Sequence, residues 1–194
     1  AYKKLKSAVL PPPMCKYLLE FNNVLIYAGG SRNPEDTDFS LDGAYFSQGD
    51  DPENVPPATN FFLVPSNDDI ISGVGKSGSV LAIFKDRSIY AVSGDLLTSQ
   101  FEVVAVAPGS NIGCAANASI VSIGGLLYFL HTNGVYTMSE SQLFPTDEFG
   151  RPVPISQMID VKFREKPFEV NRRFVFKRAV AINYTEVYEY WLFM

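Results

Sequence analysis

One stretch of the sequence, SGVGKSGS at residues 72–79, ends like a nucleotide-binding phosphate loop, with the tripeptide Gly-Lys-Ser. A complete loop starts with a glycine that four residues separate from that tripeptide, and a helix begins at the lysine. In this chain Ile70 stands in place of the glycine, and the apolar run Val80–Phe84 that follows is typical of a β-strand. We therefore expect no nucleotide site and interpret Gly75–Ser79 as a tight turn between two strands, because glycine accepts a positive φ.

An acidic segment offers oxygen ligands for calcium, since Asp36, Asp38, Ser40 and Asp42 are spaced two apart. The EF-hand loop requires glycine at its sixth position and a glutamate at its twelfth. Leu41 occupies the sixth position here, and no glutamate occupies the twelfth. We interpret the segment as a solvated acidic loop and predict no metal site, with Asp36, Asp38 and Asp42 as the candidate ligands if one forms.

Acid–base and nucleophilic catalysis have few residues to use in this chain. The only histidine is His131, which we interpret as a turn residue at the polar tip of a hairpin. Cys15 and Cys114 lie far apart in contexts that indicate strand or core positions, which argues against a disulfide framework. The carboxylates lie in loops without the partner spacing of a glycosidase. The sequence thus predicts no catalytic residue, no cofactor and no enzyme activity.

The composition is that of a globular domain with a core of its own. The 194 residues are 46% hydrophobic and 13% aromatic. Charged residues make up only 19%, and the formal net charge of −5 argues against a protein that grips nucleic-acid phosphates. No apolar run approaches the roughly 18 residues of a membrane-spanning helix, so we expect no membrane partner.

The apolar residues alternate with the period of strands rather than helices. Val80–Phe84 and Ile89–Val92 flank a polar corner and predict a β-hairpin. The segment Gly124–Ser139 aligns without a gap on Gly78–Ser93, at an offset of 46 residues. Four positions of this alignment are identical, and five more keep their apolar character. The chain therefore contains two related hairpins, one repeat apart.

Internal similarity at this period, in short strands, is typical of the blades of a β-propeller. The run Leu126–Leu130 is almost wholly apolar, as expected for a sheet buried on both faces. Two further hairpins are expected over residues 17–28 and 178–194. We predict an all-β fold, a partial propeller of about four blades with four antiparallel strands each. It forms one domain, 1–194, with an extended lead-in at 1–15. The alternative is a β-sandwich with an accidental match between the hairpins.

Three motifs follow one another along the chain: an "AG" corner at Ala28–Gly29, a "YS…DP" segment over Tyr45–Pro52, and the hairpin LAIFKDRSIYAVSG over Leu81–Gly94. In this order they resemble the propeller region of tailed-bacteriophage virion proteins, the group that includes tail nozzle (tail tubular) and head-completion or stabilisation proteins. The resemblance spans most of residues 16–140, and residues 179–194 look like the opening of the next blade. It implies a non-enzymatic structural protein of the virion, in the tail nozzle or head–tail connector.

The resemblance also implies partners, namely other tail or connector proteins and further copies of this chain in a homo-oligomeric ring around the DNA exit path. Acidic residues facing such a channel would repel DNA phosphates and favour passage over sticking. Two alternatives use the same scaffold: a module that binds a host glycan through its loops, and a phage-tail glycosidase or lyase that depends on Asp36, Asp38 or Asp51. Proteins of this group usually carry more blades, and this sequence lacks an initiator methionine and stops within a predicted strand. We therefore expect a fragment of a longer chain.

Overall fold

A computed structural model describes residues 12–30, 42–49, 51–65, 69–141, 144–159 and 176–194. Within these ranges β-strands dominate, accompanied by the short 3-10 helices η1 (Asn117–Ser119) and η2 (Ile155–Ile159), and the all-β prediction is confirmed. The strands are β1 (Cys15–Phe21), β2 (Val24–Gly30), β3 (Gly43–Phe46), β4 (Phe61–Leu63), β5 (Ile71–Ser77), β6 (Val80–Lys85), β7 (Ile89–Asp95), β8 (Gln100–Val106), β9 (Val121–Ile123), β10 (Leu126–His131), β11 (Gly134–Ser139), β12 (Val180–Tyr184) and β13 (Glu189–Phe193). Among the residues with assigned structure, no helix has the length and apolar character to cross a membrane.

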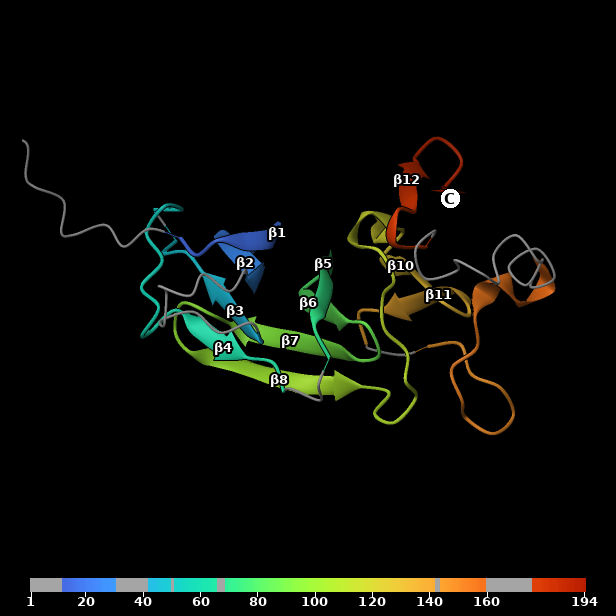
Figure 1. Cartoon of the computed structure of the whole chain (residues 1–194), viewed down its shortest axis with the longest axis horizontal. Helices are drawn as coiled ribbons and strands as arrows, with labels where there is room; N and C mark the ends of the chain where they lie inside the picture. Colours follow the sequence, from blue (N-terminus) through green and yellow to red (C-terminus); the bar gives the residue numbers. More distant parts are fainter. Residues whose placement is uncertain (1–11, 31–41, 50, 66–68, 142–143, 160–175) are drawn as a thin grey trace, which may run out of the picture.

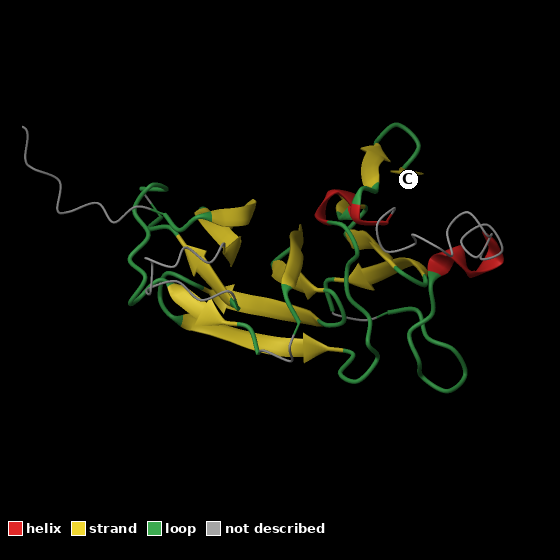
Figure 2. Ribbon diagram, in the orientation of Figure 1, coloured by secondary structure: helices red, strands yellow, loops and turns green. Residues whose placement is uncertain are grey.

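The strands form four antiparallel sheets that follow the order of the chain (Figures 1 and 2). The first sheet is β1-β2-β3-β4, the second is β5-β6-β7-β8, the third is β9-β10-β11, and the fourth is the hairpin β12-β13. In each sheet every strand pairs with its neighbour in sequence, so the sheets are simple meanders. The first and second sheets have four strands each, which is the number predicted for one blade.

The two related hairpins of the sequence lie in different sheets and share one register. In the second sheet Phe84 pairs with Ile89, and in the third sheet the aligned residues Leu130 and Val135 pair in the same way. All four predicted hairpins are present, at β1–β2, β6–β7, β10–β11 and β12–β13. The sequence match therefore reflects two copies of one sheet unit rather than two halves of one sheet.

Each pair of successive sheets encloses its own apolar core. Along β6 the side chains alternate, since Leu81 and Ile83 join the core with the first sheet while Ala82 and Phe84 join the core with the third. All six residues of β6 are buried. The side chains of Leu130 and Val135 on the third sheet pack with Leu192 of the fourth. The prediction that wholly apolar strands are buried on both faces is confirmed in β6, whereas in β10 Leu126 is 37% exposed and Tyr128 is only partly buried.

Neighbouring sheets touch mainly through their first strands. β1 and β2 pack against β5, β5 packs against β9 and β10, and β9 packs against β12 and β13. Glycine allows this approach, because a Cβ at Gly75 would lie 2.6 Å from a side-chain carbon of Ile120 and 3.1 Å from Leu127. The sheets therefore follow one another in chain order, and neighbouring sheets approach each other most closely at their first strands.

Two predictions about the ends of strands need correction. Gly75 and Ser77 belong to β5 rather than to a turn, and the turn consists of Gly78 and Ser79 only. Gly78 has a φ of +55°, the left-handed conformation that a two-residue hairpin turn requires. The lead-in is shorter than 1–15, because Cys15 already pairs with Gly30 in the first sheet. Residues 1–11 of the lead-in lie outside the described residues.

Candidate functional site

The residues that resemble a phosphate loop form part of a sheet. Lys76 forms an ion pair with Glu20 of β1, and the Ser77 hydroxyl donates a hydrogen bond to the carbonyl oxygen of Gly125 at 2.7 Å. The strand β6 follows directly, where a phosphate loop would open a helix. Lys76 and Ser77 therefore hold the second sheet to its two neighbours, and the strand expected after the turn is present.

Of the three candidate calcium ligands, Asp42 alone lies within the described residues. Asp36 and Asp38 lie outside the described residues. Asp42 is ordered, and its Oδ1 lies 3.2 Å from the Nζ of Lys85, whose side chain is fully buried. The Nζ of Lys85 also donates to the carbonyl oxygen of Pro65 at 2.8 Å. Asp42 thus pairs with a buried cation between the first and second sheets, and no cluster of three or more potential metal ligands occurs in the described ranges.

Lys85 and His131 occupy equivalent places in the two related hairpins, each at the end of its strand. Both were predicted at the polar corner of a hairpin, with His131 in the turn itself, but each ends its strand and is buried, since Lys85 is 0% and His131 only 6% exposed. The Lys85 Nζ lies 6.0 Å from the ring centre of Tyr90, and the His131 ring meets that of Tyr136 edge-on at 5.8 Å. Tyr90 and Tyr136 are also equivalent in the repeat. In each hairpin, therefore, the polar residue that ends the first strand packs on the aligned tyrosine of the second strand.

A buried carboxylate organises the turn between β6 and β7. Asp69, 8% exposed, accepts hydrogen bonds from the backbone N–H groups of Asp86 at 3.1 Å and Arg87 at 2.7 Å. These donors would otherwise be unpaired at the end of the hairpin. The residues around Asp69 carry no signal of this role, because the turn that it binds lies 17 and 18 positions later in the chain.

An open cleft of about 520 Å³ lies where the ends of the β6–β7 and β10–β11 hairpins meet. Its wall combines the basic side chains of Arg87 and Lys177 with the carboxylate of Asp86 and the ring of His131. The Nδ1 of His131 accepts the backbone N–H of Asn133 at 3.3 Å, so the ring is tied to its own turn. A wall that carries both signs of charge does not select an anion or a cation.

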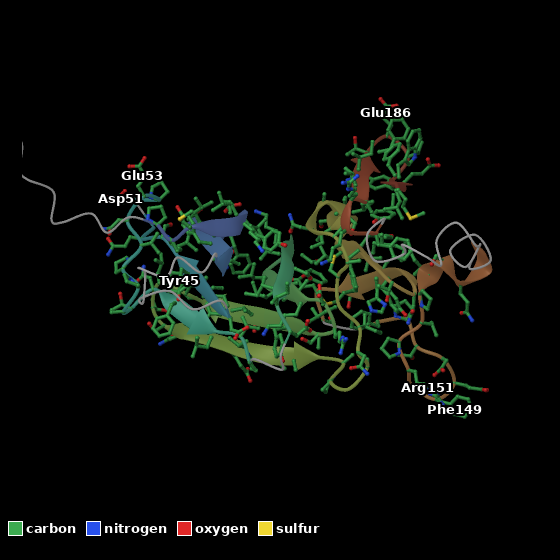
Figure 3. The ribbon with its side chains drawn as sticks, viewed as in Figure 1. Tyr45, Asp51, Glu53, Phe149, Arg151 and Glu186 are labelled. Atoms are coloured by element: carbon green, nitrogen blue, oxygen red, sulfur yellow. The ribbon has the colours of Figure 1, made fainter. Side chains whose placement is uncertain are left out.

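The remaining acidic candidates shape loops. Asp51 pairs with Gln48 in an isolated bridge beside the first sheet, close to Glu53 in Figure 3. Asp147 Oδ1 accepts the backbone N–H groups of Phe149 at 2.9 Å and Arg151 at 2.8 Å. This fixes a projecting loop with Phe149 and Arg151 at its tip (Figure 3). The Asp147 carboxylate thus orders backbone, and Asp51 and Asp147 come from separate parts of the molecule.

The two cysteines differ in access to solvent. Cys114 is fully buried, with its Sγ 3.1 Å from the carbonyl oxygen of Ala116, and burial raises the pKa of its thiol to about 12. Cys15 is half-buried at the start of β1, and burial raises the pKa of its thiol as well. Thiolate is the reactive form, so both thiols have reduced nucleophilicity at neutral pH, and Cys114 is also shielded.

A disulfide reagent is therefore expected to label Cys15 much faster than Cys114 in the folded protein at mildly alkaline pH. The variants Cys15→Ser and Cys114→Ser report each thiol separately by absorbance or mass spectrometry. Unfolding in denaturant removes the burial of Cys114 and should bring both rates to a similar value. Rapid labelling of Cys114 in folded Cys15→Ser protein would contradict its burial in the core between the second and third sheets.

The chain matches no protein-family model and no curated protein. The observations that bear on function are therefore its own repeat, its sheets and the contacts of the residues described above.

Proposed function

We propose that the four sheets are successive blades of a β-propeller. The observation that carries this proposal is the 46-residue repeat, whose two copies fall on consecutive sheets with one register. Contact through the first strand of each sheet also supports it, because the inner strands of a propeller surround a common axis. The order of the strands agrees with blades, because the chain completes each sheet as a meander before it starts the next.

We further propose that this propeller is a non-enzymatic structural part of a tailed-phage virion, in the tail nozzle or head–tail connector. The motif order over residues 16–140 supports this proposal. The roles of the described acidic groups agree with it, since Asp42, Asp69 and Asp147 stabilise loops and turns. In a ring around the DNA path, the net charge of −5 per chain would favour sliding of the genome over binding.

Immunogold labelling and mass spectrometry of purified phage particles that carry this gene test the assignment. We expect the protein in the particle, with label at the tail or at the junction of head and tail. A protein found only in the infected-cell lysate, with no copies in the particles, would contradict a virion role. A glycan array with the purified protein distinguishes the alternative, because selective binding of a host glycan would indicate a recognition module.

A further inference from the structure

Two open clefts share part of their walls near the starts of the first strands of the sheets. The cleft of about 520 Å³ described above, here called the first cleft, has Asp86 and Lys177 in common with a second cleft of about 370 Å³. The second cleft adds Lys16 from β1, Ser72 from β5 and Ala118 from the segment before β9. Lys177 itself precedes β12, so all four sheets contribute to this region.

Basic side chains outnumber acidic ones around the two clefts. Lys16, Arg87 and Lys177 are exposed, and no ion pair between described residues involves them. Asp86 is the one acidic residue among the described residues of both walls. The first cleft alone does not select a sign, but the two clefts together carry three cationic groups against one carboxylate. In a chain with a formal net charge of −5, this local excess favours an anionic partner.

A buried hydroxyl in the wall of the second cleft has no hydrogen-bond partner among the described residues. Ser72 is 7% exposed, lines this cleft, and its Oγ is unpaired. The pairing of β5 with β6 shifts between Ile71 and Gly73, so Ser72 stands in a β-bulge without an opposite residue. Bulges are frequent beside binding sites, because they redirect a side chain. A buried hydroxyl without a partner costs stability, and a ligand that supplies an acceptor removes this cost.

The apolar part of the wall distinguishes between kinds of anionic partner. Ile70 lines the second cleft and is 54% exposed, so aliphatic surface lies beside the cationic groups. The two rings in the walls are engaged in packing, Tyr17 on the core between the first and second sheets and His131 on Tyr136. A sugar usually needs an open ring on which to stack, whereas a peptide with acidic and apolar side chains matches aliphatic and cationic surface.

We propose that the two clefts bind an acidic peptide segment of a partner protein. Its carboxylates pair with Lys16, Arg87 and Lys177, an apolar side chain packs beside Ile70, and a carbonyl oxygen accepts the hydrogen bond of the Ser72 hydroxyl. An extended segment suits two adjoining open clefts, because its side chains reach separate places in the walls. The proposal goes beyond the virion assignment and does not depend on it.

A synthetic peptide with the sequence of residues 33–42 is a suitable probe, since it carries four carboxylates and the apolar side chains of Phe39 and Leu41. Fluorescence anisotropy of the labelled peptide should show saturable binding that weakens as salt is added, because salt screens exposed charges. A control peptide with amides in place of the four carboxylates should bind at least about tenfold more weakly. Equal binding of both peptides, or no binding of the acidic peptide at millimolar concentration in low salt, would overturn the proposal.

Lys177→Glu is expected to raise the dissociation constant of the peptide about tenfold, because Lys177 lines both clefts and the change replaces an attraction by a repulsion. Arg151→Glu is the matched control. It changes the net charge by the same amount on the projecting loop, outside both walls, and should leave the affinity within about a factor of two. Equal weakening in the two variants would indicate attraction by the whole molecule and would contradict a site at the clefts.

Ser72→Ala separates a binding role from a structural one. The variant should raise the dissociation constant of the peptide about fivefold, the scale of one hydrogen bond, and leave the midpoint of thermal unfolding unchanged or higher. A lower midpoint with unchanged peptide affinity would show that the hydroxyl serves the fold instead. Tighter binding of an oligogalacturonate than of the peptide, lost in Lys177→Glu, would assign the clefts to an acidic sugar and overturn the peptide. The labelling of phage particles tests the virion assignment separately.

Discussion

Replacing Phe129 by alanine is expected to lower the free energy of unfolding by about 4 kcal/mol, the usual scale for an aromatic ring lost from a core. The ring is fully buried between the second and third sheets. It lies 4.9 Å from the ring of Phe84, and the rings of Tyr136 and Phe144 contact it at 6.0 and 6.2 Å. β10 pairs with β11 on one side and with β9 on the other, so its backbone cannot easily move to fill the cavity that the ring would leave.

Equilibrium unfolding in urea, followed by circular dichroism, measures this loss. Phe149→Ala is the matched control, because Phe149 is 70% exposed and its replacement should change the free energy of unfolding by less than about 0.5 kcal/mol. An equal loss in the two variants would mean that Phe129 does not lie in a close-packed core between two sheets.

Asp42→Ala is expected to destabilise the protein by about 3–5 kcal/mol, because it leaves the buried ammonium group of Lys85 without its carboxylate. Lys85→Met should cost far less, since methionine fills a similar volume and the half-exposed Asp42 can then be solvated. The double variant Asp42→Ala with Lys85→Met should recover most of the stability lost in Asp42→Ala. Urea unfolding of the three variants measures the difference, and equal losses in both single variants would contradict a buried cation at this position.

The repeat unit could be predicted from the sequence because its signal is local. A strand buried on both faces must be apolar throughout, and its hairpin partner follows within a few residues, so Val80–Phe84 and its copy are visible without knowledge of the rest. The same local signal excluded the phosphate loop, since a strand follows Lys76 where a helix would be needed. The ends of strands were predicted less accurately than their centres: the turn expected to begin at Gly75 begins three residues later, at Gly78.

Contacts between distant segments could not be predicted in this way. The burial of Lys85, at the start of the predicted polar corner, could not be predicted, because lysine is rarely buried and its partners Asp42 and Pro65 lie far away in the sequence. One signal was present: Lys85 aligns with His131, and each precedes an aligned tyrosine by five residues. A pair of polar residues that keep the same distance from a conserved aromatic position in a repeat indicates a shared packing site.

The central claim is that the sheets are blades arranged around one axis. A cryo-electron microscopy reconstruction of the purified assembly, or of particles that contain it, tests this claim most directly. We expect β1, β5, β9 and β12 to lie closest to a common axis, with the later strands of each sheet farther out. A density in which the four sheets form two facing layers, or a line without a common axis, would contradict the propeller.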